Sequence, residues 1–411
     1  MAFLTTDGIM NTSKRILILT VDSGSGHRSA ANAIAAALRE GYGDRCSIEI
    51  VNPMADRRTP AILRRSSADY DRIVRVLPGL YKLGYEATDE PVPSSVIENA
   101  LRLMMLDVMR ALVNHHRPDV IVTTYPLYQY PLETVFALQR RTIPLVNVVT
   151  DLVTLHRLWF SPVADLCLVP TPQAQELALS HGLPAERVRL TGIPVHPRLV
   201  RRERSQAELR AELGLRPELT TFLALGSPRV PQLAEMLTAV NHSGLPIQLL
   251  AVAGGDVGLY QQLQNTTWHL PVRVFHYVHD MAPLYQAADG LISKAGGLTV
   301  AEALACGLPL LLIGVIPGQE TGNAHYVIEG GAGERAETPL AVLEILCHWL
   351  ADGGRVLAER AARARALGRP RAAHDAAELI WGAAQRPTLP YPPLVWQRWG
   401  RWLRQRWAFW R

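Results

Sequence analysis

Short runs of aliphatic and β-branched residues alternate with helical patterns along the first half of the chain. Runs of this kind predict strands that are buried on both faces, and helices between them predict parallel pairing. We therefore expect a parallel sheet covered by helices in this half. Its expected strands are 15–21, 47–51, 119–125, 144–150, 165–171 and 188–194.

A second series of apolar runs follows a charged, helix-prone stretch at 196–215. Because 411 residues exceed the size that one core usually supports, we place a domain boundary near 196–218. The predicted fold class is α/β, with two Rossmann-like halves. The strands of the second half are expected at 221–227, 247–255, 272–278, 290–296 and 309–315, and the chain divides into 14–197, 198–370 and 371–411.

The composition narrows the class of protein. Apolar residues make up 48% and charged residues 19% of the chain, which is a globular balance. The four cysteines are far apart, lie in apolar segments and form no CxxC pair, so neither a zinc site nor a disulfide framework is indicated. No apolar run reaches the roughly 18 to 20 residues of a membrane span. We therefore expect a cytoplasmic protein that does not cross a membrane.

The excess of positive charge gathers in the tail. The net charge is +5, no acidic residue follows Glu378, and residues 396–411 read WQRWGRWLRQRWAFWR. At helical spacing most of these tryptophans share one side while arginines point away, which is typical of a helix lying in a membrane interface. We expect an anionic membrane surface, and no nucleic acid, as its partner; packing on the protein itself is the alternative. The tryptophans assigned to the membrane are Trp396, Trp399, Trp402, Trp407 and Trp410.

A long insert between two expected strands, 56–112, carries leucines and methionines among arginines. Two interpretations stay open for this insert. It forms ordinary helices with buried apolar faces, or it forms a surface that accepts a lipid, because exposed methionine-rich faces are adaptable binding surfaces.

The first expected strand ends in Asp22-Ser-Gly-Ser-Gly-His27 and leads into an alanine-rich helix. A strand, a glycine turn and a helix start direct free backbone N–H groups into the crevice at the carboxyl edge of a parallel sheet. A helix start disfavours protonation of an imidazole, so His27 is expected to be neutral and able to take a proton from a hydroxyl. A structural role, as a cap or a satisfied core histidine, is the alternative.

A second glycine turn lies at 290–302, where a strand leads to Gly296 and Gly297 and then to a helix expected to start at Thr299. This helix start suits a nucleotide diphosphate, and the carboxylate of Glu302 can accept hydrogen bonds from two ribose hydroxyls. Helix capping by Thr299 and a favourable dipole interaction of Glu302 are the alternatives. The loop 317–323, PGQETGN, clusters amide and carboxylate groups that can read sugar hydroxyls or form a solvated turn.

These motifs resemble those of a known family. GGLTVAEAL followed by PGQETGN is similar to the donor-site signature of family 28 glycosyltransferases. Five further stretches are similar to the branch of monogalactosyldiacylglycerol synthases and processive diacylglycerol β-glucosyltransferases, so that the resemblance covers most of 15–333 in order. They are DSGSGHRSAANAI at 22–34, GLYKLGYEATDEP at 79–91, RPDVIVTTYPL at 117–127, DLVTLHRLWF at 151–160 and GIPVHP at 192–197.

The resemblance implies a GT-B fold, in which two Rossmann-like domains face each other across a central cleft. The first domain would bind the acceptor and the second the nucleotide sugar. The implied reaction is inverting transfer of galactose or glucose from a UDP-sugar to 1,2-diacylglycerol, without a metal or another cofactor, to form a β-glycolipid. We expect the protein to attach peripherally to the inner face of the membrane.

The resemblance also assigns roles to residues. His27 takes the position of the proposed general base, and Asp151 and His156 are candidates to assist or orient it. Val278 would present backbone to the uracil with Met281 nearby. The other donor-binding assignments are Ser227, then Gly296, Gly297, Leu298 and Thr299 for the diphosphate, Glu302 for the ribose, and Gln319, Glu320 and Asn323 for the sugar and its phosphate. The acceptor side is assigned Gly24, Ser25, Gly26 and Tyr81.

Three other functions share part of this pattern: the lipid-linked N-acetylglucosaminyltransferase of cell-wall synthesis, a UDP-N-acetylglucosamine 2-epimerase, and a catalytically silent binding protein. The GSGH turn with DLVTLHRLWF favours the glycolipid branch over the first, and the tail argues against the second. His27, Glu302 and PGQETGN together argue against the third. The choice between UDP-galactose and UDP-glucose, single or repeated transfer, and the oligomeric state stay open.

Overall fold

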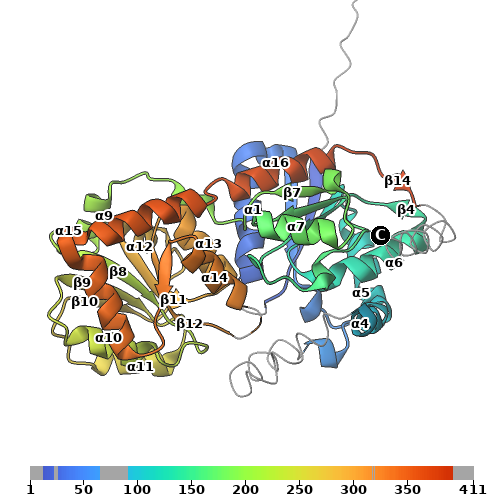
Figure 1. The fold of residues 1–411 in the computed structure, drawn as a ribbon. Helices are drawn as coiled ribbons and strands as arrows, with labels where there is room; N and C mark the ends of the chain where they lie inside the picture. Colours follow the sequence, from blue (N-terminus) through green and yellow to red (C-terminus); the bar gives the residue numbers. More distant parts are fainter. Residues whose placement is uncertain (1–12, 23–25, 65–90, 317, 319, 392–411) are drawn as a thin grey trace, which may run out of the picture.

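The computed structural model describes residues 13–22, 26–64, 91–316, 318 and 320–391. The predictions for Gly24, Ser25, Tyr81 and Gln319, and those for the five tail tryptophans, fall outside these residues. Two domains, each built on its own parallel sheet, make up the described chain (Figure 1).

The first sheet has the strand order β2-β1-β3-β5-β6-β7, and all six strands expected in this half are confirmed. Every neighbouring pair is parallel, and buried aliphatic side chains line both faces of the sheet. The strands are β1 (Lys14–Leu19), β2 (Cys46–Val51), β3 (Val120–Thr123), β5 (Leu145–Val148), β6 (Leu166–Val169) and β7 (Val188–Leu190). A separate antiparallel pair, β4 (Arg141–Thr142) with β14 (Leu389–Pro390), was not predicted.

The second sheet has the order β10-β9-β8-β11-β12-β13 and is also parallel throughout. Its five expected strands are confirmed. They are β8 (Thr220–Leu225), β9 (Ile247–Val252), β10 (Val272–Phe275), β11 (Gly290–Lys294) and β12 (Leu310–Gly314). The edge strand β13 (Gly333–Arg335) was not predicted, because its three residues contain no apolar run.

Helices cover both faces of the first sheet (Figure 1). The α-helices of this domain are α1 (Gly26–Tyr42), α4 (Pro91–Met104), α5 (Leu106–His116), α6 (Gln129–Gln139) and α7 (Pro172–Ser180). The short helix α8 (Pro197–Val200) lies in the segment that connects the domains, 191–219, and packs mainly on the second domain. Short 3₁₀ turns lie at Gly43–Arg45, Pro53–Ala55, Pro126–Tyr128, Arg157–Trp159 and Ala185–Arg187.

The described end of the long insert forms α4 and α5. Both helices pack on α6 and bury one apolar face, which includes Leu101 of α4 and Met109 of α5, and Met105 between the helices is buried with them. On α4, Val96 and Leu103 stay exposed. The interpretation as helices with buried faces is therefore confirmed for this part of the insert, while lipid binding stays a prediction.

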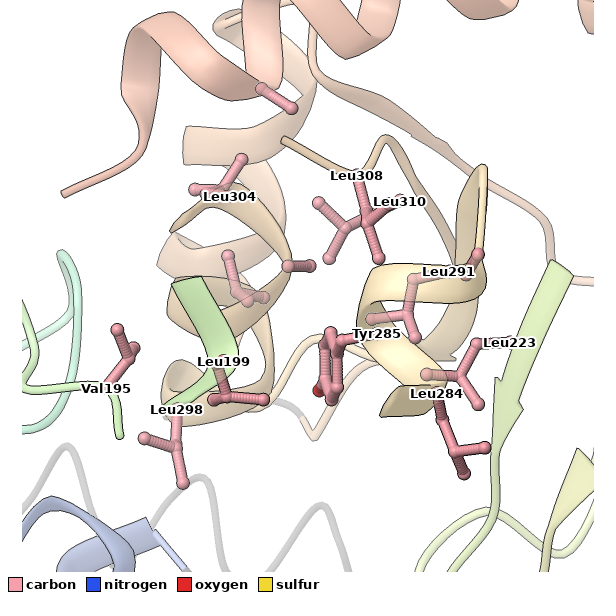
Figure 2. Close-up of a cluster of buried hydrophobic side chains, with 14 of the residues drawn as sticks. Val195, Leu199, Leu223, Leu284, Tyr285, Leu291, Leu298, Leu304, Leu308 and Leu310 are labelled. Atoms are coloured by element: carbon pink, nitrogen blue, oxygen red, sulfur yellow. The ribbon is translucent and has the colours of Figure 1, made fainter. Parts of the chain in front are cut away.

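The second domain has the same layered arrangement. Its helices are α9 (Gln206–Glu212), α10 (Leu233–Asn241), α11 (Val257–Asn265), α12 (Ala282–Ala287), α13 (Gly297–Cys306), α14 (Thr321–Glu329) and α15 (Pro339–Leu367). Helix α15 is interrupted at 351–354, where Asp352, Gly353 and Gly354 have positive φ. Leucines from α13, α12 and the sheet form one core with Val195 and Leu199 of the connecting segment (Figure 2).

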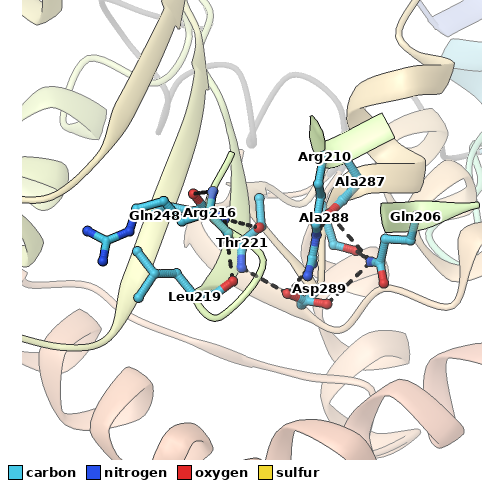
Figure 3. Close-up of polar contacts among 9 residues, drawn as sticks. All are labelled: Gln206, Arg210, Arg216, Leu219, Thr221, Gln248, Ala287, Ala288 and Asp289. Carbon is cyan, nitrogen blue, oxygen red and sulfur yellow. Dashed lines mark hydrogen bonds and ion pairs between the residues drawn. The ribbon is translucent and has the colours of Figure 1, made fainter. Parts of the chain in front are cut away.

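Polar contacts from helix α9 hold the amino ends of strands β8 and β11 together. Arg210 forms an ion pair with Asp289, and the other contacts of Asp289 include the backbone N–H of Thr221 at 2.8 Å (Figure 3). Gln248 donates to Thr221 Oγ1 at 2.9 Å. These bonds satisfy backbone and side-chain groups that are buried at the amino ends of β8 and β11.

The chain passes between the domains twice. After the first passage, at 191–219, it builds the second domain, and after α15 it returns to the first domain as α16 (Ala372–Ala384), which lies along α1 (Figure 1). The buried faces of both helices are rich in alanine, so they approach closely, and Tyr42 stacks on Trp381 with ring centroids 4.3 Å apart. The two passages touch, because a Cβ on Gly192 would lie 2.6 Å from Cβ of Arg369.

Candidate functional site

Each sheet reverses its strand order at one point, between β1 and β3 in the first and between β8 and β11 in the second. In open parallel sheets, ligands bind beyond the carboxyl ends of the strands at such a point. His27 lies beyond β1, and Gly296 lies beyond β11. The two glycine turns singled out in the sequence therefore occupy the expected ligand-binding position of their own sheets.

The start of α1 is held by the side chains around it. Arg28 Nε and Asn52 Nδ2 donate to the two carboxylate oxygens of Asp22, at 2.7 and 2.8 Å. The Arg28 hydrogen bond is the largest of the effects that lower the pKa of Asp22. Asp22 therefore anchors the turn into α1.

The imidazole of His27 is bound through one nitrogen. Nδ1 lies 2.7 Å from the carbonyl oxygen of Thr124 and 2.9 Å from Oγ1 of Thr150. A carbonyl can only accept a hydrogen bond, so Nδ1 carries the proton and Nε2 keeps its lone pair. Among the described residues, Nε2 has no hydrogen-bond partner. This tautomer is the one that a general base on the Nε2 side requires.

Burial keeps the His27 imidazole neutral. The ring packs against Tyr125 and Trp159, with centroids 5.2 and 6.2 Å away. Desolvation lowers the pKa of His27 to about 4, against a smaller opposing effect of the bond to Thr124. The Nε2 lone pair is thus free at neutral pH. The sequence predicted a neutral imidazole from the helix start, whereas burial is the cause in the structure.

The two residues predicted to assist His27 are placed differently from each other. Asp151 lies beside the second domain, where its Cα is 3.5 Å from the position that a Cβ on Gly297 would take. His156 is buried, and its Nδ1 accepts a hydrogen bond from the backbone N–H of Leu158, which caps the 3₁₀ turn carrying Trp159. His156 therefore holds the turn that packs against His27, and assistance by Asp151 stays a prediction.

In the second domain, α13 begins at Gly297, two residues earlier than expected. Gly296 is its N-cap, so Thr299 lies inside the first turn and does not cap the helix. Thr299 is partly exposed there, while Leu298 is buried. The free N–H groups of this first turn are the ones that can bind an anionic group.

A buried ion pair lies beneath this helix start. Lys294, the last residue of β11, pairs with Glu320, and the other carboxylate oxygen of Glu320 accepts from the backbone N–H of Ile316 at 3.0 Å. A Cβ on Gly296 would lie 2.8 Å from the Lys294 ammonium nitrogen, so glycine leaves room for the pair. Glu320, predicted as a sugar ligand, is only 4% exposed and holds the loop to β11.

Glu302 points toward the core of the second domain. Tyr285 donates its hydroxyl to Oε2 of Glu302 at 2.8 Å, and Tyr285 lies in the middle of the leucine core (Figure 2). Desolvation raises the pKa of Glu302 to about 7, although the hydrogen bond from Tyr285 acts in the opposite direction. The hydrogen bond from Tyr285 engages only Oε2, so Oε1 can accept bonds from a ligand.

The remaining donor-side residues lie at the same edge of the second sheet. Ser227 follows β8, where its Oγ accepts from the backbone N–H of Arg229 at 3.2 Å. Val278 follows β10, and Met281 is the N-cap of α12. Both are partly buried against the core.

The two domains meet at the helix starts. A Cβ on Gly26 would lie 3.8 Å from Cβ of Leu298, so α1 and α13 begin side by side. Asn323, predicted as a sugar ligand, is fully buried and spans the domains: its Oδ1 accepts from Leu152 N–H at 3.2 Å, and its Nδ2 donates to the carbonyl of Ala295 at 3.0 Å. The side-chain amide of Asn323 is thus engaged by protein on both sides.

Four residues of this site were missed by the sequence reasoning: Thr124, Thr150, Tyr285 and Lys294. Three of them lie at or just beyond the carboxyl ends of β3, β5 and β11, which is the signal that could have found them. Tyr285 gives no such signal, because a buried tyrosine in a helix is an ordinary core residue.

Comparison with known proteins decides the family. A family model described as monogalactosyldiacylglycerol (MGDG) synthase matches residues 27–195, and the glycosyltransferase family 28 C-terminal domain matches residues 230–341. A probable chloroplastic monogalactosyldiacylglycerol synthase of Glycine max is 32% identical over 392 residues, which cover 92% of this chain and 73% of that protein. The chain belongs to the monogalactosyldiacylglycerol synthase family. Monogalactosyldiacylglycerol synthase 1 of Arabidopsis thaliana is 31% identical over 89% of this chain and 71% of its own length.

Solved structures show that this family member has the GT-B fold. MurG of Acinetobacter baumannii matches with a TM-score of 0.58 at 19% identity, over 90% of this chain and 99% of that one. A UDP-GlcNAc 2-epimerase of Neisseria meningitidis matches with a TM-score of 0.59 at 12% identity, over 90% and 98%. The fold is thus shared with an epimerase, and the family membership makes this chain a glycosyltransferase of the galactolipid type.

Within the described parts of the chain, no helix combines the length and apolar character needed to span a membrane. The same residues contain no group of three or more histidine, cysteine or acidic side chains placed to hold a metal ion.

Proposed function

We propose that the protein transfers a hexose from a UDP-sugar to the primary hydroxyl of 1,2-diacylglycerol and inverts the anomeric configuration. The observation that carries this proposal is the pair of adjacent helix starts, with neutral His27 on α1 and the glycine turn that begins α13 beside it. The names of the relatives, monogalactosyldiacylglycerol synthases, support diacylglycerol as acceptor and galactose as the first candidate sugar.

The proposed mechanism begins with removal of the acceptor proton. As the hydroxyl oxygen of diacylglycerol attacks the anomeric carbon, its proton passes to Nε2 of His27. The resulting imidazolium keeps its Nδ1–H bond to Thr124, which stabilises the charge. Attack from the face opposite the leaving group converts an α-linked donor into a β-glycolipid.

The bond between the anomeric carbon and the diphosphate oxygen breaks at the same time. The negative charge that develops on UDP would be stabilised by the N–H groups at the start of α13, next to Gly296 and Gly297. We propose that this helix start suffices without a divalent ion. Glu302 would accept from the ribose hydroxyls, and the backbone near Val278 would contact the uracil.

The sugar would be read by the loop that precedes α14. Because Glu320 and Asn323 are engaged within the protein, we assign them to holding this loop in place against the cleft. This role still makes them necessary for the shape of the sugar site.

We propose that the protein works peripherally at the cytoplasmic face of a membrane. The acceptor is a lipid, and the tryptophan- and arginine-rich tail has the composition of an interfacial helix. Attraction of its arginines to anionic lipid would add about 1 kcal/mol for each basic residue near the surface.

The direct test is incubation of the protein with diacylglycerol liposomes and one UDP-sugar at a time, with the lipid product identified by mass. A hexosyl-diacylglycerol with UDP-galactose or UDP-glucose, formed equally with and without a chelator, is expected. An isomerised UDP-sugar in the absence of acceptor would instead indicate an epimerase. Transfer of N-acetylglucosamine to an isoprenoid lipid would point to the cell-wall enzyme.

A further inference from the structure

One segment of the first domain, Thr150–Thr154, contacts the starts of α13 and α14 in the second domain. We call it the bridging segment. The segment begins two residues after the end of β5. Its Leu152 N–H donates to Asn323 at 3.2 Å, and its Thr154 Oγ1 accepts from the Gly322 N–H at 3.1 Å. Two hydrogen bonds therefore tie the bridging segment to the start of α14.

Two glycines make this approach possible. A Cβ on Gly297 would lie 2.8 Å from the carbonyl oxygen of Thr150, and a Cβ on Gly322 would lie 2.8 Å from the backbone nitrogen of Thr154 and overlap its hydroxyl. Real Cβ atoms do not approach backbone this closely. Since neither glycine has a positive φ, the contact with the other domain explains why neither position tolerates a side chain.

The bridging segment also reaches the base. The hydroxyl of Thr150 lies 2.9 Å from Nδ1 of His27, while the carbonyl of the same residue packs on Gly297. Thr150 is 5% exposed, so its hydroxyl has little access to water. A displacement of Thr150 would change the surroundings of the His27 ring directly.

We propose that Thr150 is a positioning residue for His27, and that Asn323 clamps the bridging segment so that the base takes its working position only when the domains are in contact. This inference rests on the proposed function in one respect, namely that His27 is the base. Its physical contacts do not depend on that assignment.

The arrangement has a chemical use. A UDP-sugar bound beside a well-oriented base and open to water would be hydrolysed, because water can replace the acceptor hydroxyl. If the base is aligned only by contact with the donor domain, alignment and exclusion of water occur together. The bridging segment would couple the two events.

The first test compares Thr150→Val with Thr150→Ser. Valine keeps the shape and removes the hydroxyl, whereas serine keeps the hydroxyl. We expect Thr150→Val to lower kcat by tenfold or more with the KM for UDP-sugar changed less than twofold, and Thr150→Ser to retain most of the activity. Equal loss in both variants, in proportion to the loss of folded protein, would reduce Thr150 to a packing residue.

The second test measures the clamp without using activity. Hydrogen exchange at the Leu152 amide is followed by mass spectrometry or NMR in the full chain, with and without UDP. We expect Asn323→Ala and the wedge variant Gly322→Ala to speed this exchange at least tenfold. Gly382→Ala is the matched control, because a Cβ there meets nothing within 4 Å.

The two measurements separate the possible failures. Unchanged Leu152 exchange in Asn323→Ala would overturn the clamp even if the enzyme transfers hexose as proposed. Faster exchange with full kcat would overturn the coupling to the base. If Asn323→Ala and Gly322→Ala lose protection of the Leu152 amide while His27→Ala keeps its turnover, the clamp is supported and His27 is rejected as the base.

Discussion

Nδ1 of His27 lies 2.7 Å from the carbonyl oxygen of Thr124, which follows β3 directly. This contact sets which nitrogen of the ring holds the proton, and it does so with a backbone atom. In many histidine bases a carboxylate has this orienting role and raises the basicity of the ring. Here a neutral backbone carbonyl orients the imidazole, and burial of the ring keeps it uncharged at neutral pH.

Removal of the base should abolish turnover and spare binding. We expect His27→Ala to lower kcat by about a hundredfold or more, the usual effect of losing a general base. The affinity for UDP should stay within about twofold, because the groups proposed to bind the donor belong to the other domain. Isothermal titration with UDP and a liposome transfer assay measure the two quantities. Undiminished turnover would exclude His27 as the proton acceptor.

The pH dependence of kcat should lack the usual histidine step. With its pKa lowered from 6.5 to about 4, His27 stays neutral at pH 5, so kcat at saturating donor should not fall around pH 6.5. The free energy of unfolding should depend on pH in the corresponding direction. Because His27 has a higher pKa in the unfolded chain than in the folded protein, its stabilising contribution is present above pH 6.5 and is lost as the pH falls through about 4. A kcat profile centred on 6.5, with the fold intact by circular dichroism, would contradict this assignment.

Donor affinity should depend on pH through Glu302. Because burial raises the pKa of Glu302 to about 7, the carboxylate that we propose to bind ribose is mostly protonated at pH 6 and mostly ionised at pH 8. If only the ionised form binds, UDP affinity should be about tenfold higher at pH 8. Glu302→Gln should bind weakly at both values. Titration calorimetry in matched buffers measures the difference, and equal wild-type affinities would remove Glu302 from the ribose site.

Tyr285→Phe is the companion variant for Glu302. The tyrosine hydroxyl lowers the pKa of Glu302, so its removal should move the rise in UDP affinity to higher pH.

The contribution of Glu302 to the free energy of unfolding has the opposite pH dependence from the UDP affinity. Its folded pKa is raised, so the contribution is present below about 4.5 and is lost as the pH rises through about 7. Thermal unfolding of Glu302→Gln against wild type from pH 5 to 8 should show this trend.

Lys294 should matter for stability as well as for the donor site. Lys294→Met leaves the carboxylate of Glu320 buried without its cation, which costs about 3 to 5 kcal/mol in the free energy of unfolding. The double variant Lys294→Met with Glu320→Gln should recover much of this loss. Arg355→Met is the control, because its pair with Glu359 is exposed and should cost less than about 1 kcal/mol. Urea unfolding gives all the values, and similar costs for the two single variants would show that the Lys294 pair is not buried in solution.

The tail should control membrane recovery and leave the chemistry intact. Deletion of 392–411, which keeps β14, should reduce flotation with anionic liposomes severalfold, since it removes five tryptophans and five arginines. Transfer to an acceptor dissolved in detergent should change little. Equal recovery of the full and shortened chains on liposomes would reject the interfacial helix.

The sequence predicted the sheets well because each central strand is a continuous apolar run. The missed strands are short edges: β13 has three residues, and β4 with β14 has two each, so no pattern exists to detect them. The start of α13 was placed two residues late, because Gly296 caps it without a side chain. Local patterns thus located the elements and were weaker at their ends.

For the candidate site, the sequence placed both glycine turns at the carboxyl edges of their sheets, since a glycine turn after a parallel strand has one possible position in the fold. It did not reveal which polar groups face inward. Asn323 and Glu320 look like ligands in a glycine-rich loop, but their burial depends on Leu152 and Lys294, which belong to distant parts of the chain. Residue type alone carries no information about such partners.

The two passages of the chain between the domains touch at Gly192 and Arg369, on α16's approach to α1. Two adjacent connections between the domains act as a hinge. They permit rotation of one domain relative to the other and oppose sliding of one domain along the other. The contact of Asn323 with the bridging segment would then open by rotation about this hinge, with little change in the two connections themselves. A cut in the chain before α16 would remove one of the two connections and permit further relative motions of the domains. The starts of α13 and α1 would then no longer be brought together in a single arrangement.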